Sequence, residues 1–246
     1  MAFDGIVTMA AAAEMRPVIV SGKIDKVYQP ESDELVFNIY TKNGNVKLYA
    51  SVNPAAARVH FIENSLQNPP APLPFCMLLR KHVQGARITD VSQRGSERII
   101  EISLETLNEL GFTVSKKLIF EIMGKHSNII LVGIASGKII DSIKHVSIDV
   151  NRVRQLLPGV VYQYPPVQDK IPFKDLLAGV PPALPTEAGL IQRAVGGISP
   201  AFAEEMAAAA DPVDFLRTAA GDIEGGRIRP AIYSDDKGVP KEFHVV

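Results

Sequence analysis

The sequence of 246 residues has a single cysteine, no tryptophan and no long apolar run, and these shortages exclude several classes of protein. Cys76 cannot form an internal disulfide, and its apolar neighbours predict a buried side chain rather than a reactive thiol. No stretch approaches the roughly 18 apolar residues of a membrane span. The N-terminus lacks the basic and continuously apolar regions of a signal peptide. We therefore expect a cytoplasmic protein.

The usual motifs of catalysis and metal binding are also missing. No two histidines are three or four residues apart, and a lone cysteine cannot supply a pair of thiolates, so no metal site is predicted. The sequence contains neither a Gly-x-Ser-x-Gly motif nor a phosphate loop of the Walker type. We expect no catalytic residue and no cofactor, which favours a binding module over an enzyme.

The net charge of −1 conceals an uneven distribution of charge. Residues 80–154 carry 12 lysines and arginines against 8 acidic residues, together with three of the five histidines. Residues 155–246 have the opposite balance, 8 against 12. This pattern favours a local surface for an anionic partner over a uniformly basic nucleic-acid binder, although chance alone could produce an excess of four.

Residues 1–168 predict a β-rich domain that begins with a helix, capped by Asp4 and ended by Pro17. In the segments that follow, apolar and polar residues alternate with a period of two, as in β-strands. Lys42-Asn43-Gly44-Asn45 predicts a hairpin between two of these segments. The predicted elements are the strands Val18–Gln29, Glu34–Thr41, Val46–Val52 and Arg58–Ile62, the helix Phe75–Gln84, and the strands Arg87–Gln93, Arg98–Leu104, Lys117–Met123, Asn128–Val132 and Lys138–Val146.

A boundary at Pro165-Pro166 separates this domain from an all-helical one at residues 169–226. Residues 227–246 predict a hairpin around Asp235–Gly238 whose continuation is missing, so the chain is expected to be a fragment. The predicted helices are Phe173–Ala178, Glu187–Val195, Pro200–Ala210 and Pro212–Ala220, and Gly221 with Gly225-Gly226 is expected to close this part of the chain.

Within the helical domain, two short helices meet at a glycine hairpin, a pattern typical of a helix-hairpin-helix motif. Ser199 is placed to cap the second helix, and Pro200 suits its first position. Backbone amides at Gly197, Ile198 and Ser199 could hold a nucleic-acid phosphate at the positive end of that helix. The alternative is a plain helical corner that only packs.

Gly124-Lys125-His126-Ser127-Asn128, between two predicted strands, concentrates hydrogen-bond donors in one connection. Rigid strands would hold such a cluster at the end of a sheet, as a phosphate- or sugar-binding edge requires. An ordinary hairpin loop is an equal alternative. We expect His126 and Asn128 to support the turn and Lys125 to contact phosphate.

The predicted turn Arg94-Gly95-Ser96-Glu97-Arg98 places a carboxylate beside a guanidinium. Such a pair can read a hydroxyl or base edge and a phosphate together, although a solvated turn is the commoner outcome. Lys144-His145 and Asn151–Arg154 add donors for which solvated surface is again the default.

Several segments together carry a resemblance to a known family. The chain resembles the N-terminal part of the NFACT proteins from about residue 3 to residue 205. The matching segments are Phe3-Asp4-Gly5, Lys23–Pro30, Asn68-Pro69-Pro70, Phe75–His82, Glu121–Leu131, Asp141–Lys144, Asn151–Arg154, Pro158-Gly159 and Tyr164-Pro165-Pro166.

The resemblance implies an α+β protein in two parts. A β-rich domain similar to the N-terminal domain of formamidopyrimidine-type DNA glycosylases would precede the helix-hairpin-helix domain. It also implies ribosome-associated quality control, in which the protein binds a large ribosomal subunit obstructed by peptidyl-tRNA and recruits alanyl-tRNA to tail the stalled chain. The family continues beyond this length into a coiled coil and an RNA-binding domain.

The family's tRNA-binding acidic residue maps onto Asp4, and its Asp-Arg pair maps onto Glu97 and Arg98. Glutamate in place of aspartate lengthens the carboxylate stem by one methylene, which either is tolerated or weakens tRNA selection. Five cations complete the expected tRNA-binding set: Arg80, Lys81, Lys125, Lys144 and Arg152.

Two alternatives come from other classes of function. The family's older label predicts a surface adhesin for fibronectin or fibrinogen, but the sequence shows no export signal. The glycosylase-like fold suggests DNA repair, yet the chain begins Met1-Ala2-Phe3 rather than with the Pro-Glu that those enzymes use, and it lacks their four-cysteine zinc finger.

Overall fold

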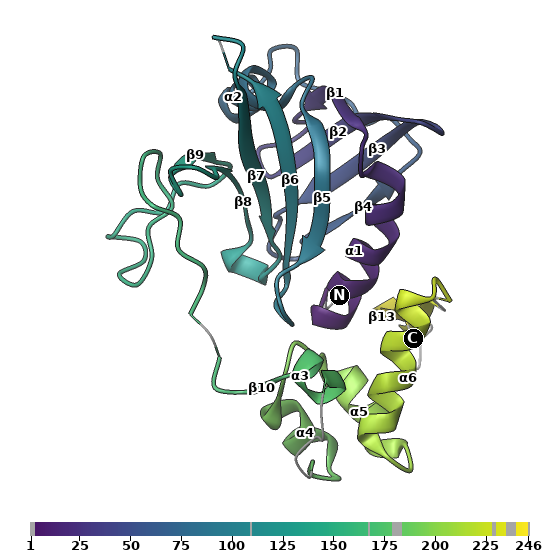
Figure 1. Ribbon diagram of the computed structural model, residues 1–246. Helices are drawn as coiled ribbons and strands as arrows, with labels where there is room; N and C mark the ends of the chain where they lie inside the picture. The colour runs from purple at the N-terminus through teal and green to yellow at the C-terminus, as the bar shows by residue number, and fades with distance from the viewer. Residues whose placement is uncertain are drawn as a thin grey trace. The chain divides into compact units, whose positions relative to one another are not determined.

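The computed structural model describes residues 3–108, 110–166, 168–178, 184–227, 230–234 and 240–245, the last two ranges by their backbone only (Figure 1). The chain forms two compact units. The sheet unit comprises Met15–Ser92 and Ile99–Pro165, and the helical unit comprises Met1–Glu14, Gln93–Arg98 and Pro166–Val246.

The sheet unit contains nine strands, hydrogen-bonded in the order β4-β3-β2-β1-β5-β6-β7-β8-β9. β1 is antiparallel to both β2 and β5, so it joins two runs of sequential hairpins into one sheet. The strands are β1 Lys23–Tyr28, β2 Glu34–Thr41, β3 Gly44–Ser51, β4 Arg58–Ile62, β5 Arg87–Gln93, β6 Ile99–Leu107, β7 Thr113–Glu121, β8 Asn128–Gly133 and β9 Ile139–Ser142.

The predicted strands were largely correct, because period-two alternation and turn residues both mark them. β2, β4 and β5 have the predicted bounds. The hairpin signal is also confirmed, since Thr41 pairs with Gly44 around a two-residue turn. The first strand was predicted to begin at Val18, but Val18 and Ile19 belong to the preceding helix.

The sheet bends until its two halves face each other, and the main core lies between them (Figure 1). Phe37 on β2 meets Phe120 on β7 edge to face, with ring centroids 6.2 Å apart, although three strands separate β2 from β7 in the sheet. The alternation predicted for β6 is confirmed: Ile100, Ile102 and Leu104 share one face.

Two helices accompany the strands, α1 (Gly5–Ile19) and α2 (Pro74–Val83). The cap predicted at Asp4 is confirmed, because its carboxylate accepts from the amide of Val7. The predicted end at Pro17 is wrong, since the helix continues for two more residues. Proline removes one amide donor near the C-terminal end, and Ile19, which is fully buried, keeps the last turn packed.

The other face of β6, β7 and β8 carries a second, smaller core that contains acidic groups. Glu121 is 1% exposed, and one carboxylate oxygen accepts from the Arg154 guanidinium and, at 2.6 Å, from the Tyr162 hydroxyl. Tyr164 donates likewise to Glu101, which also pairs with Lys117 at 2.8 Å. The segment after β9 therefore covers this face with hydroxyls and a guanidinium that satisfy the buried carboxylates.

The helical unit holds short helices and two small strand pairs. The predicted helix at 173–178 is confirmed. Of the closing glycines, Gly221 lies inside the last helix, whereas Gly225 caps its end as predicted. The elements are β10 Ile171–Pro172, α3 Phe173–Ala178, α4 Ala188–Ala194, β11 Val195–Gly196, α5 Pro200–Ala208, α6 Pro212–Glu224, β12 Pro230–Ser234 and β13 Pro240–Val245. The predicted terminal hairpin corresponds to β12 and β13, but its turn lies outside the described residues.

The compact units differ from the linear domains expected at 1–168, 169–226 and 227–246. The passage from sheet to helices does occur near the predicted boundary, at Pro166, and β12 and β13 cluster with the helices. However, the first 14 residues and Gln93–Arg98 also cluster with the helical unit. Contacts between distant parts of the chain decide this grouping. Among the described residues, no helix is long and apolar enough to span a membrane.

The buried pair between Glu121 and Arg154 gives the first prediction. Arg154→Met should lower the free energy of unfolding by about 3–5 kcal/mol, because it leaves a buried carboxylate without its cation. The double variant Glu121→Leu, Arg154→Met should recover most of this loss. Urea denaturation measures both effects, and equal losses in the single and double variants would contradict the assignment.

The loss in Arg154→Met should also depend on pH. Burial already raises the pKa of Glu121 despite the nearby guanidinium, and removing Arg154 raises it further. A raised pKa in the folded state favours folding at low pH and costs stability as the pH rises through it. The deficit relative to the unsubstituted chain should therefore be smallest in acid.

Candidate nucleic-acid interface

Asp4 is the centre of the helical unit's contacts with the start of the chain. One carboxylate oxygen accepts from the Val7 amide at 2.9 Å and thereby caps α1. The other accepts from the Ser199 amide at 2.8 Å, just before α5. The side chain is buried, with the residue 5% exposed. One negative charge thus lies at the N-termini of two helices, where their dipoles favour an anion.

Around Asp4, three chain segments approach closely enough for their backbones to touch. The Gly5 amide donates to the Gly197 carbonyl at 2.7 Å. The side-chain amide of Gln93 donates to the Gly5 carbonyl at 2.7 Å and to the Glu97 carbonyl at 2.9 Å. A Cβ added at Gly5 would lie 2.5 Å from the Ser96 carbonyl oxygen. Only glycine fits there, because any side chain would collide with backbone atoms.

The glycine hairpin between α4 and α5 has the predicted local chemistry. Ser199 caps α5 by accepting from the Phe202 amide at 3.2 Å, and Pro200 takes the first helical position. Gly197 has φ +86°, a conformation that disfavours residues with a side chain. However, the Ser199 amide that was predicted for a phosphate is bonded to Asp4. In this structure the protein's own carboxylate occupies the position expected for an external anion.

Glu97 and Arg98 lie in the turn that these contacts hold. Ser96 fixes the turn from its buried side, since its hydroxyl accepts from the Lys174 amide at 3.0 Å. Both Glu97 and Arg98 are half-buried. Within the described part of the chain, neither the carboxylate nor the guanidinium has a hydrogen bond or an ion pair. The structure therefore brings the predicted acid-cation pair into the same unit as Asp4 and leaves it able to bind a ligand.

The Gly124–Asn128 connection is a 3₁₀ turn, Gly124–His126, which Ser127 joins to the start of β8 at Asn128. Asn128 supports it as predicted: the carboxamide donates to the Lys144 carbonyl at 2.8 Å and accepts from the Lys144 amide at 3.1 Å. The prediction for His126 is wrong, because this side chain is exposed. Ser127 is the second support, and its hydroxyl accepts from the Met123 amide at 2.8 Å.

The five predicted cations divide by their surroundings. Lys125 and Arg152 are exposed, and the described residues provide no ion pair for either. Lys81 is exposed as well. Arg80 and Lys144 instead donate to backbone carbonyls, those of Val27 and Val52 respectively. Burial lowers the pKa of Lys144, as expected for an ammonium withdrawn from water.

The residues that assemble this interface were not predicted from the sequence. Gln93 was assigned only to a strand, and Ser96 only to a turn. Both act on partners far along the chain, so no local pattern indicates them. The three consecutive polar residues after Val91 and the glycine beside Asp4 are weak signals at most. No group of residues that could hold a metal occurs in the described ranges.

Comparison with known proteins gives the family. The family model for NFACT N-terminal and middle domains matches residues 4–245. This chain belongs to the NFACT family. The predicted resemblance is therefore confirmed, and it extends beyond residue 205, where the recognisable segments ended.

Individual relatives agree with this assignment. The chain is 40% identical over 210 residues to the Rqc2 homolog RqcH of Bacillus subtilis, a match that covers 83% of this chain and 37% of that protein. It therefore spans about a third of the length of such curated relatives. The whole relatives contain much that this chain does not.

Solved structures share the fold. The N-terminal part of the fibronectin/fibrinogen-binding protein from Streptococcus suis superposes with a TM-score of 0.85 at 32% identity, covering 95% of this chain and 88% of that one. The N-terminal domain of the fibronectin-binding protein PavA from Streptococcus pneumoniae gives 0.78 at 33% identity, covering 95% and 92%. The α+β class is thus shown, while the likeness to DNA glycosylases and the helix-hairpin-helix assignment remain predictions.

The close approach at Gly197 gives a prediction with a matched control. Gly197→Ala should destabilise the chain strongly, because its Cβ would lie 2.4 Å from the Ser96 carbonyl oxygen at a φ of +86°. Gly95→Ala, in the same interface but with open space around the added Cβ, should lower the stability by only about 1–2 kcal/mol, because alanine would have to adopt a left-handed backbone conformation. Thermal unfolding compares the two. Equal losses would show that the backbone contact does not matter.

Proposed function

We propose that this chain is the tRNA-binding module of a ribosome-associated quality control factor. Membership of the NFACT family and similarity to the Rqc2 homolog RqcH support the general role. The observation that carries the tRNA-binding part is the turn at Glu97 and Arg98. This turn presents an acid and a cation that have no partner among the described residues. Hydrogen bonds of Gln93 and Ser96 hold its backbone in place.

The two side chains suit complementary parts of a nucleotide. A guanidinium can donate two parallel hydrogen bonds to a phosphate, and a carboxylate can accept from a ribose hydroxyl or an amino group of a base. The pair is half-buried, so part of its desolvation cost is already met by folding. Contacts from one turn to both phosphate and base or sugar would fix the register of the RNA.

In this proposal Asp4 positions the interface rather than leading the contact. Its carboxylate is buried and accepts from the amides of Val7 and Ser199. Loss of that charge would release the glycine hairpin and, through Gly5 and Gln93, the turn that holds Arg98. An effect of Asp4 substitutions on tRNA binding would then be transmitted through the backbone.

The wider role remains part of the proposal. On the sheet unit, exposed Lys125, Lys81 and Arg152 would bind phosphates of the RNA, which is the usual task of surface cations. Recruitment of alanyl-tRNA, binding to an obstructed large subunit with its peptidyl-tRNA, and a cytoplasmic, ribosome-associated location are inferred from the family. They would involve the full length of the relatives, of which this chain spans about a third.

Substitution of Arg98 tests the tRNA contact. Arg98→Ala should weaken tRNA binding by the loss of a charge-assisted phosphate contact, worth about 1.5–3 kcal/mol, or roughly 10- to 150-fold. Fluorescence anisotropy with labelled tRNA at moderate salt gives the affinity. Arg217→Ala, an exposed arginine on α6 paired with Asp214, is the matched control and should change little. Equal affinities for the two variants would refute the role of Arg98.

The solved relatives favour a second candidate function. Their names describe proteins that bind fibronectin or fibrinogen, and we propose weak fibronectin binding as a secondary activity of this chain. Surface plasmon resonance against immobilised fibronectin should then show saturable binding that excess tRNA leaves unchanged if the sites differ. A response no greater than that of an unrelated protein of the same charge would dismiss it.

A further inference from the structure

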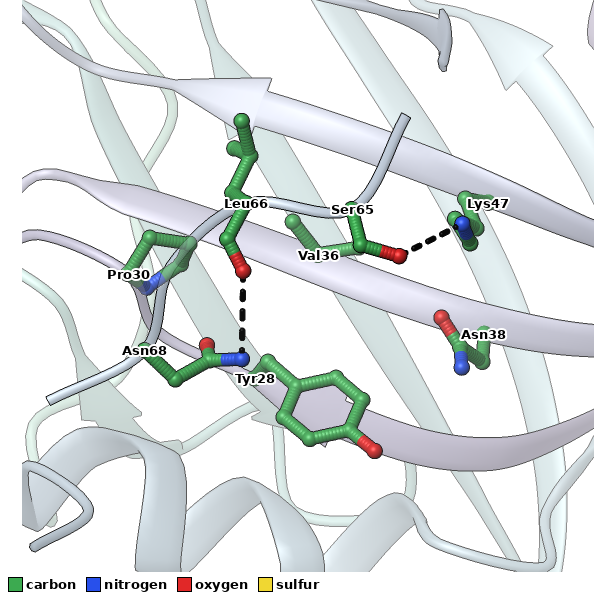
Figure 2. Close-up of a pocket in the computed structure, with 8 residues that line it drawn as sticks. All are labelled: Tyr28, Pro30, Val36, Asn38, Lys47, Ser65, Leu66 and Asn68. Carbon is green, nitrogen blue, oxygen red and sulfur yellow. Dashed lines mark hydrogen bonds between the residues drawn. The ribbon is translucent and has the colours of Figure 1, made fainter. Parts of the chain in front are cut away.

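A small pocket lies on the sheet unit, over the face of β1, β2 and β3 that points away from the core (Figure 2). Its volume is about 170 Å³. The floor is formed by Val36 and Asn38 of β2 and by Lys47 of β3, and Tyr28 at the end of β1 lies beside them. Residues 65–68 pass over the opposite side as a strap.

Polar groups line this pocket, and two of them have no hydrogen-bond partner among the described residues. In the described part of the chain, the Asn38 carboxamide and the Tyr28 hydroxyl make no hydrogen bond. Lys47 donates to the Glu63 carbonyl at 2.9 Å and to the Ser65 hydroxyl at 3.0 Å, which ties the strap to the sheet. An ammonium group has three donors, so one remains for a ligand.

The size and walls of the pocket limit what it can hold. Drug-sized ligands usually occupy roughly 300–1,000 Å³, so this pocket fits a single small ring system. The aromatic ring of Tyr28 and the apolar side chains of Val36 and Leu66 suit a flat ligand. The Arg80 guanidinium lies 5.7 Å from the centre of the Tyr28 ring. An aromatic ring beside a guanidinium is a common surface for stacking a base.

The charges around Asn38 identify the kind of ring. Its cross-strand neighbours are lysines on both sides, Lys26 on β1 and Lys47 on β3. A carboxamide carries a donor NH₂ group beside an acceptor oxygen, and this arrangement matches the edge of a nucleobase. The flanking ammonium groups suit the phosphates that accompany a base in a nucleic acid and would give an uncharged aromatic ring no comparable attraction.

We propose that this pocket binds one unpaired base of RNA. The Tyr28 ring stacks on the base, Asn38 reads its edge, and Lys26 and Lys47 contact the neighbouring phosphates. The inference rests on the proposed RNA-binding function but adds a contact that the predicted tRNA-binding residues do not include, apart from Arg80. It places recognition of a single-stranded segment on the sheet unit.

The experiment measures binding of a fluorescein-labelled RNA decamer of mixed, non-pairing sequence. Tyr28→Leu and Asn38→Leu should each weaken binding roughly tenfold, as expected for loss of a stacked or hydrogen-bonded base. Tyr40→Leu is the matched control, because Tyr40 is a tyrosine on the same face of β2, 62% exposed and outside the pocket. It should bind like the unsubstituted chain. Circular dichroism melts confirm that each variant folds.

A second readout locates the base directly. With 4-thiouridine in the decamer, ultraviolet light should crosslink a peptide that contains Tyr28 or Asn38. Crosslinks confined to other peptides, or equal affinities for the Tyr28→Leu and Tyr40→Leu chains, would overturn the proposal. Binding of adenosine monophosphate without binding of the decamer would overturn it as well, since the ligand would then be a free nucleotide.

Failure of this proposal can be told apart from failure of the proposed tRNA function. If the pocket is not a base site, Arg98→Ala still weakens tRNA binding while Tyr28→Leu leaves it unchanged. If the chain does not bind tRNA, the unsubstituted chain shows no tRNA affinity at all. Decamer binding and crosslinking then decide the pocket independently.

Discussion

The helical unit depends on one buried carboxylate shared between two helices. Asp4 accepts from the first turn of α1 and from the amide that precedes α5, so a single charge satisfies donors that would otherwise lack partners at both helix ends. The start of the chain and its last third are thereby fixed to each other. A buried charge is costly unless it is hydrogen-bonded in this way, and here the amides of two helix N-termini provide the compensation.

The same contact determines what the glycine hairpin can do. In a phosphate-binding hairpin the free amides at the N-terminus of the second helix receive an external anion. Here Asp4 already receives the Ser199 amide, and Gly5 is bonded to Gly197. The hairpin is therefore engaged in organising the unit. The charged groups that can meet an anion are side chains on the turn that the hairpin supports, above all that of Arg98.

Local patterns predicted most of the secondary structure, and tertiary contacts decided the exceptions. Alternation located β2, β4 and β5, and Ser199 and Pro200 located the start of α5. The continuation of α1 beyond Pro17 was not predicted, because the packing of Ile19 outweighs the loss of one amide donor. The supports around Asn128 were half predicted, since exposure of His126 is a tertiary property.

Residue identity and local order were enough to predict the family, the α+β class and the adjacent acid and cation at Glu97 and Arg98. They could not determine that Asp4 is buried against Ser199, or that residues 93–98 belong with the helices, because both arise from contacts between segments far apart in the chain. The pocket beside Tyr28 could not be predicted from the sequence for the same reason. Its residues come from three strands and a strap, and only the pairing of those strands brings them together.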